Sequence, residues 1–286
     1  MMSRRLFTAI GLVALVGLSS ATWAQKAETT AQKTETPTLE EILQRLESNL
    51  SQYDSGVPSF FADEHVVSRI VPDVHDQETV TDSVFRLKRV VNADRSTTLE
   101  ESREVKTVNG QPAKSQEMGG PSIVHGAFEG ALTVVSLSQQ SCMNYTLERT
   151  KRNDAQAPIV VRFASVLTAE NKGGCLLQEN GRGQVYIDRA TMQITRMELT
   201  IPHHTIIPGN EVGHGAIMGE WALSVDYAPV VLEGKSFWMP ATINSRCTSG
   251  LGSFHPIAWT FKASYRNFHK LEVRSRIVPW SGATAQ

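Results

Sequence analysis

The last third of the sequence alternates apolar and polar residues at every second position, the pattern of β-strands with one buried face. Between residues 221 and 227 every odd position is apolar or aromatic and every even position is small or polar, and residues 257–265 repeat the pattern. A sheet that curls around so aromatic a face forms either the wall of an apolar cavity or a packed core against a helix. The aromatic residues predicted on this face, as candidate ligand-binding residues, are Trp221, Tyr227, Trp259, Phe261 and Tyr265.

Residues 1–24 have the three parts of an export signal. Two arginines give a positive start, residues 6–18 form an apolar run, and small residues lead to a predicted cleavage site after Ala24. The run is shorter than the about 20 residues of a membrane span, although an uncleaved N-terminal anchor is the alternative. Residues 25–37 lack large apolar side chains and are expected to form a flexible leader. We therefore predict a periplasmic or secreted protein of a Gram-negative-type bacterium, without a transmembrane segment after signal removal.

The chain that follows is expected to form one domain, at residues 38–280, with residues 281–286 as a tail. No internal repeat or linker interrupts it. The net charge of the whole chain is −1, which argues against a nucleic-acid partner. In an oxidising compartment its three cysteines allow one disulfide and one free thiol. Cys142 and Cys175 are the nearest pair in sequence, and three reduced, buried cysteines are the alternative.

Residues 38–53 carry the clearest helical pattern. Thr38, with Glu41 three residues later, has the form of a capping box at a helix N-terminus. Apolar residues then recur at helical spacing on one face, namely Leu39, Ile42, Leu43, Leu46 and Leu50. Because only strand patterns follow this helix, its apolar face is expected to pack against a sheet.

The rest of the chain has mainly strand patterns. Strands are predicted at 60–71, 83–91 and 97–108, and the Asn109–Gly110 pair after the third is a strong tight-turn signal. The closing meander is predicted as separate strands at 221–227, 236–239, 243–247, 257–265 and 268–277. One helix followed by about eight to ten sequential strands predicts an α+β fold with an antiparallel sheet.

Three stretches of the C-terminal half carry a family resemblance. They are a strand–Asp turn–strand unit at 183–196, the segments 225–229 and 234–240, and the last strand pair from Tyr265 onward. Together they resemble the periplasmic lipoprotein-carrier superfamily of LolA/LolB type and uncharacterised exported proteins of the acidobacterial type. Over residues 38–278, the resemblance implies a strongly curved antiparallel sheet, a half-barrel wrapped around the N-terminal helix, with a lid-like segment over an apolar cavity.

The glycine-rich segment 119–132 lies where that superfamily has its lid. The candidate gate residues within it are Gly119, Gly120, Phe128 and Gly130. The resemblance implies a binding protein that holds a hydrophobic ligand, a lipid or an acyl chain, and that takes part in envelope lipid or lipoprotein trafficking.

Patterns for catalysis and metal binding are weak. The densest cluster of potential metal ligands is His203, His204, Glu211 and His214, but its spacing matches no metal motif, and nearby prolines and glycines predict a loop. Serines near histidines, such as Ser122 near His125, lack the Gly-x-Ser-x-Gly form of a nucleophile elbow. Adjacent carboxylates such as Asp63 and Glu64 point to opposite faces of a strand and cannot flank one substrate bond. We therefore expect no enzyme, no cofactor and no catalytic residues.

The predicted function is binding of a hydrophobic small molecule or lipid. The alternative is a structural or sensory module that uses the same fold, with its interior filled by side chains, to bind another envelope protein. An exported hydrolase is the third interpretation.

Overall fold

The computed structural model describes residues 37–71, 77–94, 97–116, 128, 130–148, 157–206, 217–249 and 258–272. All of them belong to one unit, Pro37–Gln286. The predicted signal, the tail and all of the leader but Pro37 lie outside the described residues. The helices are α1 (Leu39–Gly56) and the short α2 (Gly130–Thr133), with 3-10 turns η1 (Leu137–Gln139) and η2 (Lys172–Gly174).

The described strands form one antiparallel sheet, in the order β4-β3-β2-β1-β11-β10-β9-β8-β7-β6-β5. Their bounds are β1 (Phe60–Val71), β2 (Gln77–Val91), β3 (Thr97–Val108), β4 (Gln111–Pro112), β5 (Met143–Leu147), β6 (Ile159–Ser165), β7 (Arg182–Ile187), β8 (Ile194–Ile206), β9 (Ile217–Leu232), β10 (Lys235–Ser249) and β11 (Ala258–Lys270). The sheet therefore consists of two meanders, β1–β4 and β5–β11, that join where β11 pairs with β1.

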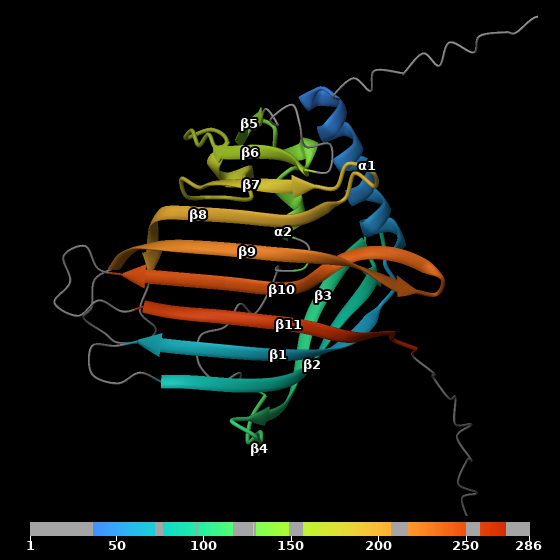
Figure 1. Cartoon of the computed structure of the whole chain (residues 1–286), viewed down its shortest axis with the longest axis vertical. Coiled ribbons are helices and arrows are strands. Elements are labelled where there is room, and N and C mark those ends of the chain that lie inside the picture. Colours follow the sequence, from blue (N-terminus) through green and yellow to red (C-terminus); the bar gives the residue numbers. More distant parts are fainter. Residues whose placement is uncertain are drawn as a thin grey trace, which may run out of the picture. The chain divides into compact units, whose positions relative to one another are not determined.

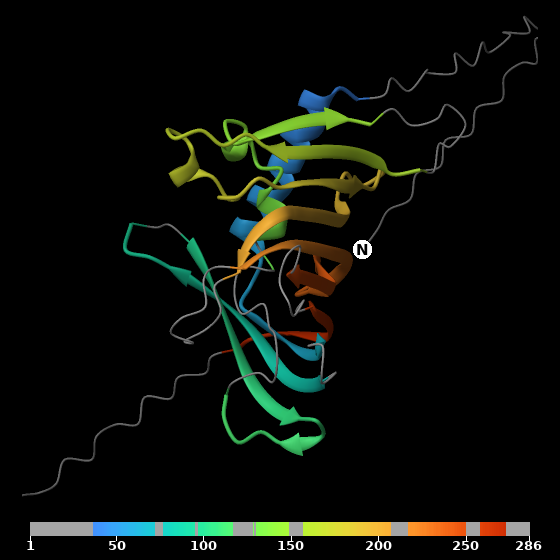
Figure 2. The same ribbon diagram turned by 90° about the vertical axis from the view of Figure 1, so that its left-hand side faces the viewer.

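The sheet bends around its two helices. Figure 1 shows α1 and α2 against the same face of the sheet, and Figure 2 shows β2 and β3 running at a steep angle to β6–β8. An α+β fold with a curved antiparallel sheet beside an N-terminal helix is thus confirmed. Within the described residues the sheet is open, with β4 and β5 as its outer strands. The half-barrel and the lid stay predictions.

Helix α1 begins at the predicted capping box. The Thr38 hydroxyl accepts a hydrogen bond from the backbone N–H of Glu41 at 3.3 Å, and the Glu41 carboxylate accepts one from the backbone N–H of Thr38 at 2.8 Å. Ile42, Leu43 and Leu46 of the predicted apolar face are buried against the sheet. No helix of the described part of the chain is long and apolar enough to cross a membrane.

The inner face of the sheet, which faces α1, carries the apolar residues of the sequence alternation. In β9 and β11 the side chains of Val225, Tyr227, Phe261 and Tyr265 are buried, while Trp221 and Trp259 are partly buried against the same core. Polar residues at the intervening positions, such as Lys262, face outward and are exposed. The period-two pattern therefore identified the buried face of these strands correctly.

Two predicted strand breaks are wrong, because the strands continue through bulges. Segments 236–239 and 243–247 belong to one strand, β10, in which Pro240 pairs with Tyr227 beside a register shift. Proline is tolerated in a sheet where the ladder is already interrupted. Asn267, with φ of 56°, likewise stands within β11, opposite the irregularity between Phe61 and Asp63. Residues 268–270 thus continue β11 rather than starting a new strand, and residues 273–277 lie outside the described residues.

Gly183 of β7 is the glycine whose replacement we expect to disrupt the sheet. A Cβ atom there would lie 1.9 Å from the backbone oxygen of Glu198 and 2.5 Å from the Phe163 ring. Gly183→Ala is therefore expected to lower the free energy of unfolding by about 1–3 kcal/mol, the cost of overpacking. The measurement is urea denaturation, with Gly174→Ala as control because its Cβ would meet no atom within 4 Å. Equal midpoints for the two variants would contradict the close approach.

The three cysteines separate into a disulfide and a free thiol. Cys142 and Cys175 are bonded, with their Cα atoms 5.5 Å apart, and Cys247 is free and buried in β10. The disulfide ties the start of β5, an outer strand, to the turn η2. Burial raises the pKa of the Cys247 thiol, so it is held in the neutral form.

Candidate ligand-binding groove

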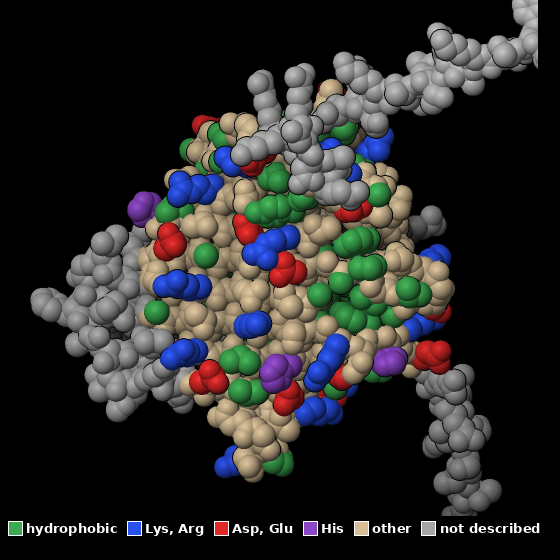
Figure 3. Space-filling model, viewed as in Figure 1, with side chains coloured by type: hydrophobic (Ala, Val, Ile, Leu, Met, Phe, Trp, Pro, Cys, Tyr) green, Lys and Arg blue, Asp and Glu red, His purple; other side chains and the backbone are tan. Residues whose placement is uncertain are grey.

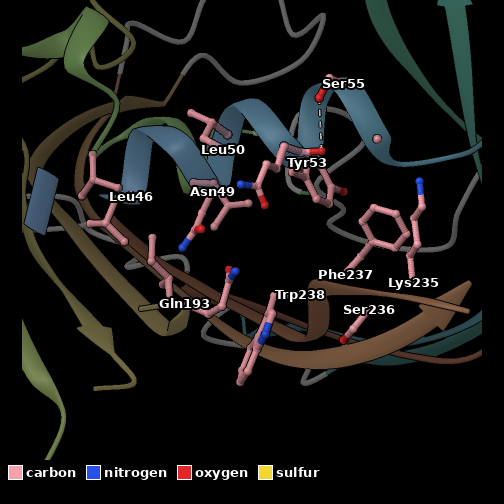
Figure 4. A pocket seen from close by; sticks show the side chains of 15 residues that line it. Leu46, Asn49, Leu50, Tyr53, Ser55, Gln193, Lys235, Ser236, Phe237 and Trp238 are labelled. Atoms are coloured by element: carbon pink, nitrogen blue, oxygen red, sulfur yellow. Dashed lines mark hydrogen bonds between the residues drawn. The ribbon is translucent and has the colours of Figure 1, made fainter. Parts of the chain in front are cut away.

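A cavity of about 450 Å³ lies between α1, α2 and the starts of β8 and β10 (Figure 4). We call it the α1–β10 groove. Its apolar lining residues are Leu46, Leu50, Leu132, Val135, Ile194, Phe237 and Trp238. Its polar lining residues are Asn49, Gln52, Tyr53, Ser55, Gln193, Lys235 and Ser236, together with the backbone of Gly56. The volume is within the about 300–1,000 Å³ of small-molecule sites.

Helix α1 forms one wall of the groove because its apolar stripe runs on beyond the core. Leu46 and Leu50 are four residues apart and therefore share a helix face. Leu46 is buried, while Leu50 is partly exposed. Between them, the Asn49 side-chain amide donates a hydrogen bond to the backbone oxygen of Met192 at 2.7 Å. This bond fixes α1 to the turn that precedes β8.

The turn between β7 and β8, which begins at Asp188, places Met192 beside α1. The Asp188 carboxylate accepts hydrogen bonds from the backbone N–H of Thr191 at 2.8 Å and of Ala190 at 3.1 Å. These hydrogen bonds lower the pKa of Asp188, and the bond from Thr191 has the largest effect. The turn is therefore held by a charged carboxylate. Met192, with φ of 54°, then leads into Ile194, which lines the groove.

The hairpin between β9 and β10 forms the opposite wall. Its two turn residues, Glu233 and Gly234, both have positive φ, at 52° and 75°, as a type I′ turn requires. Alternation along β10 then turns Phe237 toward the inner face, where it is buried. In Figure 4 the side chains of Phe237 and Lys235 point toward α1. The predicted segment 236–239 contains Phe237, and Lys235 directly precedes it; we did not predict either as a site residue.

The hairpin end of the sheet is also the more hydrophobic part of the outer face. Figure 3 shows charged side chains of both signs scattered over this face and hydrophobic ones gathered toward the hairpin end of β9 and β10. Val231, beside the hairpin turn, is 67% exposed, the highest value among the large hydrophobic residues described. The groove therefore lies next to an apolar surface.

The five aromatic residues predicted to bind a ligand do not line the groove. Phe261, Tyr265 and Tyr227 are buried within the core. Trp221 is partly buried, and its indole N–H donates a hydrogen bond to the Ser245 hydroxyl at 2.7 Å; Trp259 is also partly buried. The structure therefore places these side chains in the packed inner face of the sheet, and a role for them in ligand binding stays a prediction.

A buried ion pair lies on the inner face of β1 and β3. The Arg103 guanidinium donates from Nε to Glu64 at 2.9 Å, and the Glu64 carboxylate also accepts from the hydroxyls of Ser83 at 2.6 Å and Tyr265 at 2.9 Å. Burial lowers the pKa of Arg103, but the adjacent Glu64 carboxylate outweighs it and holds that pKa above its usual value. Arg103 therefore keeps its positive charge beside Glu64. The Phe85 ring lies 5.0 Å from the same guanidinium.

Of the candidate gate residues, Phe128 and Gly130 are described, while Gly119 and Gly120 lie outside the described residues. Phe128 is fully buried; its ring stacks on Phe85 with centroids 4.4 Å apart and meets Tyr265 edge-on at 4.8 Å. Its backbone N–H donates to Glu101 at 3.2 Å. Gly130 is the first residue of α2. Phe128 thus fills space over the inner face, and its opening as a gate stays a prediction.

The predicted metal cluster is described only in half. His203 and His204, expected in a loop, lie in β8 instead, and Glu211 and His214 lie outside the described residues. His204 contacts a carboxylate that the sequence did not suggest, with Nδ1 2.5 Å from Glu179. Among the described residues no group of three His, Cys, Asp or Glu side chains could hold a metal ion.

Comparisons with known proteins give structural neighbours only. No family model matches the sequence, and no curated protein matches it. One solved structure, described as an outer membrane lipoprotein-sorting protein domain from Vibrio parahaemolyticus, is 11% identical with a TM-score of 0.36, covering 80% of this chain and 90% of that chain. Another, a DUF1329 family protein from Desulfovibrio piger, is 10% identical with a TM-score of 0.36, covering 82% and 94%.

Proposed function

We propose that this protein is an exported binding protein that holds a hydrophobic ligand, a lipid or an acyl chain, in the α1–β10 groove. The observation that carries the proposal is the groove itself, a cavity of about 450 Å³ with seven apolar lining residues. An acyl chain that leaves water for such a wall gains about 0.8 kcal/mol for each buried CH₂ group. The aromatic inner face supports the groove as core rather than forming the site.

The surroundings of the groove support a ligand that arrives from a membrane. Val231, which is exposed, lies beside the turn of the hairpin that forms one groove wall. Figure 3 shows hydrophobic side chains gathered toward this end of the outer face. The Cys142–Cys175 disulfide suits the oxidising compartment to which the predicted signal would send the chain. Trafficking of an envelope lipid or lipoprotein is the role that we propose for this binding.

A protein-binding module is the second candidate, because one observation favours it. Phe128, Phe85 and Tyr265 fill the middle of the inner face with stacked and edge-on rings. An interior closed in this way offers no room for a ligand there, so a module of this kind would use its outer surface. The two candidates differ in whether the groove takes up an apolar chain.

The test is uptake of a fluorescent fatty acid by the mature protein, purified without detergent, together with native mass spectrometry for co-purified lipid. Leu50→Arg, which places a charge in the groove at a partly exposed position, is expected to weaken uptake at least about tenfold, equivalent to about 1.4 kcal/mol. Leu176→Arg is the matched control, because Leu176 is exposed and does not line the groove. A bare mass and no uptake by the unaltered protein would favour the protein-binding module.

A further inference from the structure

We propose that the ligand of the α1–β10 groove is a single-chain amphiphile with an anionic head group, a carboxylate or phosphate, which is held at Lys235. This inference rests on the proposed function and adds the chemistry of the head group. The side chains that line the groove include one cation, Lys235, and no Asp or Glu. The wall is therefore net positive, although the chain as a whole has a net charge of −1.

Lys235 is available for a ligand because the neighbouring carboxylate, that of Glu233, already forms another ion pair. Glu233, two residues earlier in the same hairpin, forms an ion pair with Lys270 of β11. In the described part of the chain, no carboxylate forms an ion pair with Lys235. Its side chain is exposed and points from β10 toward the C-terminal end of α1 (Figure 4). An ammonium group in this position can neutralise an anion at the groove mouth.

The one cation that lines the groove lies at the end nearest the C-terminus of α1, where Phe237 lies beside it. Leu46, Leu50 and Ile194 line the wall toward the other end, together with Asn49, whose amide is already bonded to Met192. The α1 residues from Leu46 to Gly56 span about 15 Å at 1.5 Å per residue, which gives the groove a long axis along the helix. A head group at Lys235 would thus direct its tail along α1 toward Leu46.

The test compares probes that share one tail and differ in head charge. Dodecanoate, dodecyl phosphate, dodecanol and dodecyltrimethylammonium are each titrated against the mature protein at low ionic strength, by displacement of a fluorescent fatty acid. The two anions are expected to bind about fivefold more tightly than dodecanol, the upper range for one exposed ion pair, and the cation more weakly. The relative affinity of the two anions distinguishes a carboxylate head from a phosphate head. Added salt should reduce the preference for anions because it screens the ion pair.

Variants of Lys235 then test whether this residue causes the preference for anionic probes. Lys235→Gln is expected to abolish the preference for anions, and a circular dichroism spectrum like that of the unaltered protein shows that the variant is folded. Lys235→Glu should reverse the preference in favour of the cation. Lys262→Gln is the matched control, because Lys262 is exposed on the outer face of β11 and its loss changes the net charge equally. If all four probes bind equally, or if Lys235→Gln behaves as Lys262→Gln does, the anionic-head inference is overturned. If no probe binds, the proposed function itself fails.

Discussion

Arg103→Met is expected to lower the free energy of unfolding by about 3–5 kcal/mol, the cost of leaving a buried charge without its partner. The side chains of Arg103 and Glu64 are only 6% and 0% exposed. Without the guanidinium, the Glu64 carboxylate would keep only the hydrogen bonds from Ser83 and Tyr265. Two hydroxyl groups do not offset the desolvation of a full negative charge. Urea denaturation followed by circular dichroism measures the loss.

Two further variants test whether the loss of stability in Arg103→Met comes from leaving a buried charge unpaired. The double variant Glu64→Gln/Arg103→Met removes both charges and is expected to recover most of the lost stability. Lys88→Gln breaks the pair with Glu100 on the outer face of β2 and β3, where the side chains are 60% and 57% exposed, and should cost no more than about 1 kcal/mol. If Arg103→Met were no more destabilising than Lys88→Gln, the buried ion pair would not have the role in the core that its geometry indicates.

Replacing Cys142 and Cys175 with alanine is expected to lower the free energy of unfolding by about 3–4 kcal/mol in the chain-entropy model. The disulfide joins residues that are 33 positions apart, so its removal lets a long loop of the unfolded chain move freely. The bond also ties the start of the outer strand β5 to η2. The measurement is the urea midpoint of the oxidised protein against that of the double variant.

Reducing agent provides the control for the disulfide. The unaltered protein should unfold at lower urea when reduced, whereas the double variant should not respond. Cys247→Ala, which leaves the disulfide intact, should respond as the unaltered protein does because Cys247 is a free thiol. A reduced protein as stable as the oxidised one would show that the disulfide contributes nothing to stability.

Local elements of this fold could be predicted from sequence because their signals are local. Strands β1 and β3 have the predicted bounds, and the turn at Asn109 and Gly110 has positive φ at both residues, 51° and 73°. The capping box of α1 likewise depends on residues three positions apart. The breaks predicted within β10 and β11 are wrong because the strands continue through bulges, whose positions depend on the partner strand.

The candidate site could not be predicted in the same way, because it depends on pairing between distant segments. Leu50 and Phe237 line the same groove from segments far apart in the chain. Alternation correctly placed Asp63 and Glu64 on opposite faces: Glu64 is buried, and Asp63 is exposed. Alternation does not give the register between β1, β3 and β11, and that register brings Arg103 and Tyr265 to Glu64.

The position of β1 beside β11 has a consequence for the order in which the sheet can be assembled. The first strand of the chain is in the middle of the sheet, and its neighbour there is the last strand described. Glu64 and Tyr265, which share a hydrogen bond, are 201 positions apart. Contacts so distant in sequence form late and slow the folding of a domain. During synthesis from the N-terminus, β1 and β10 therefore each keep an unpaired edge until β11 has emerged.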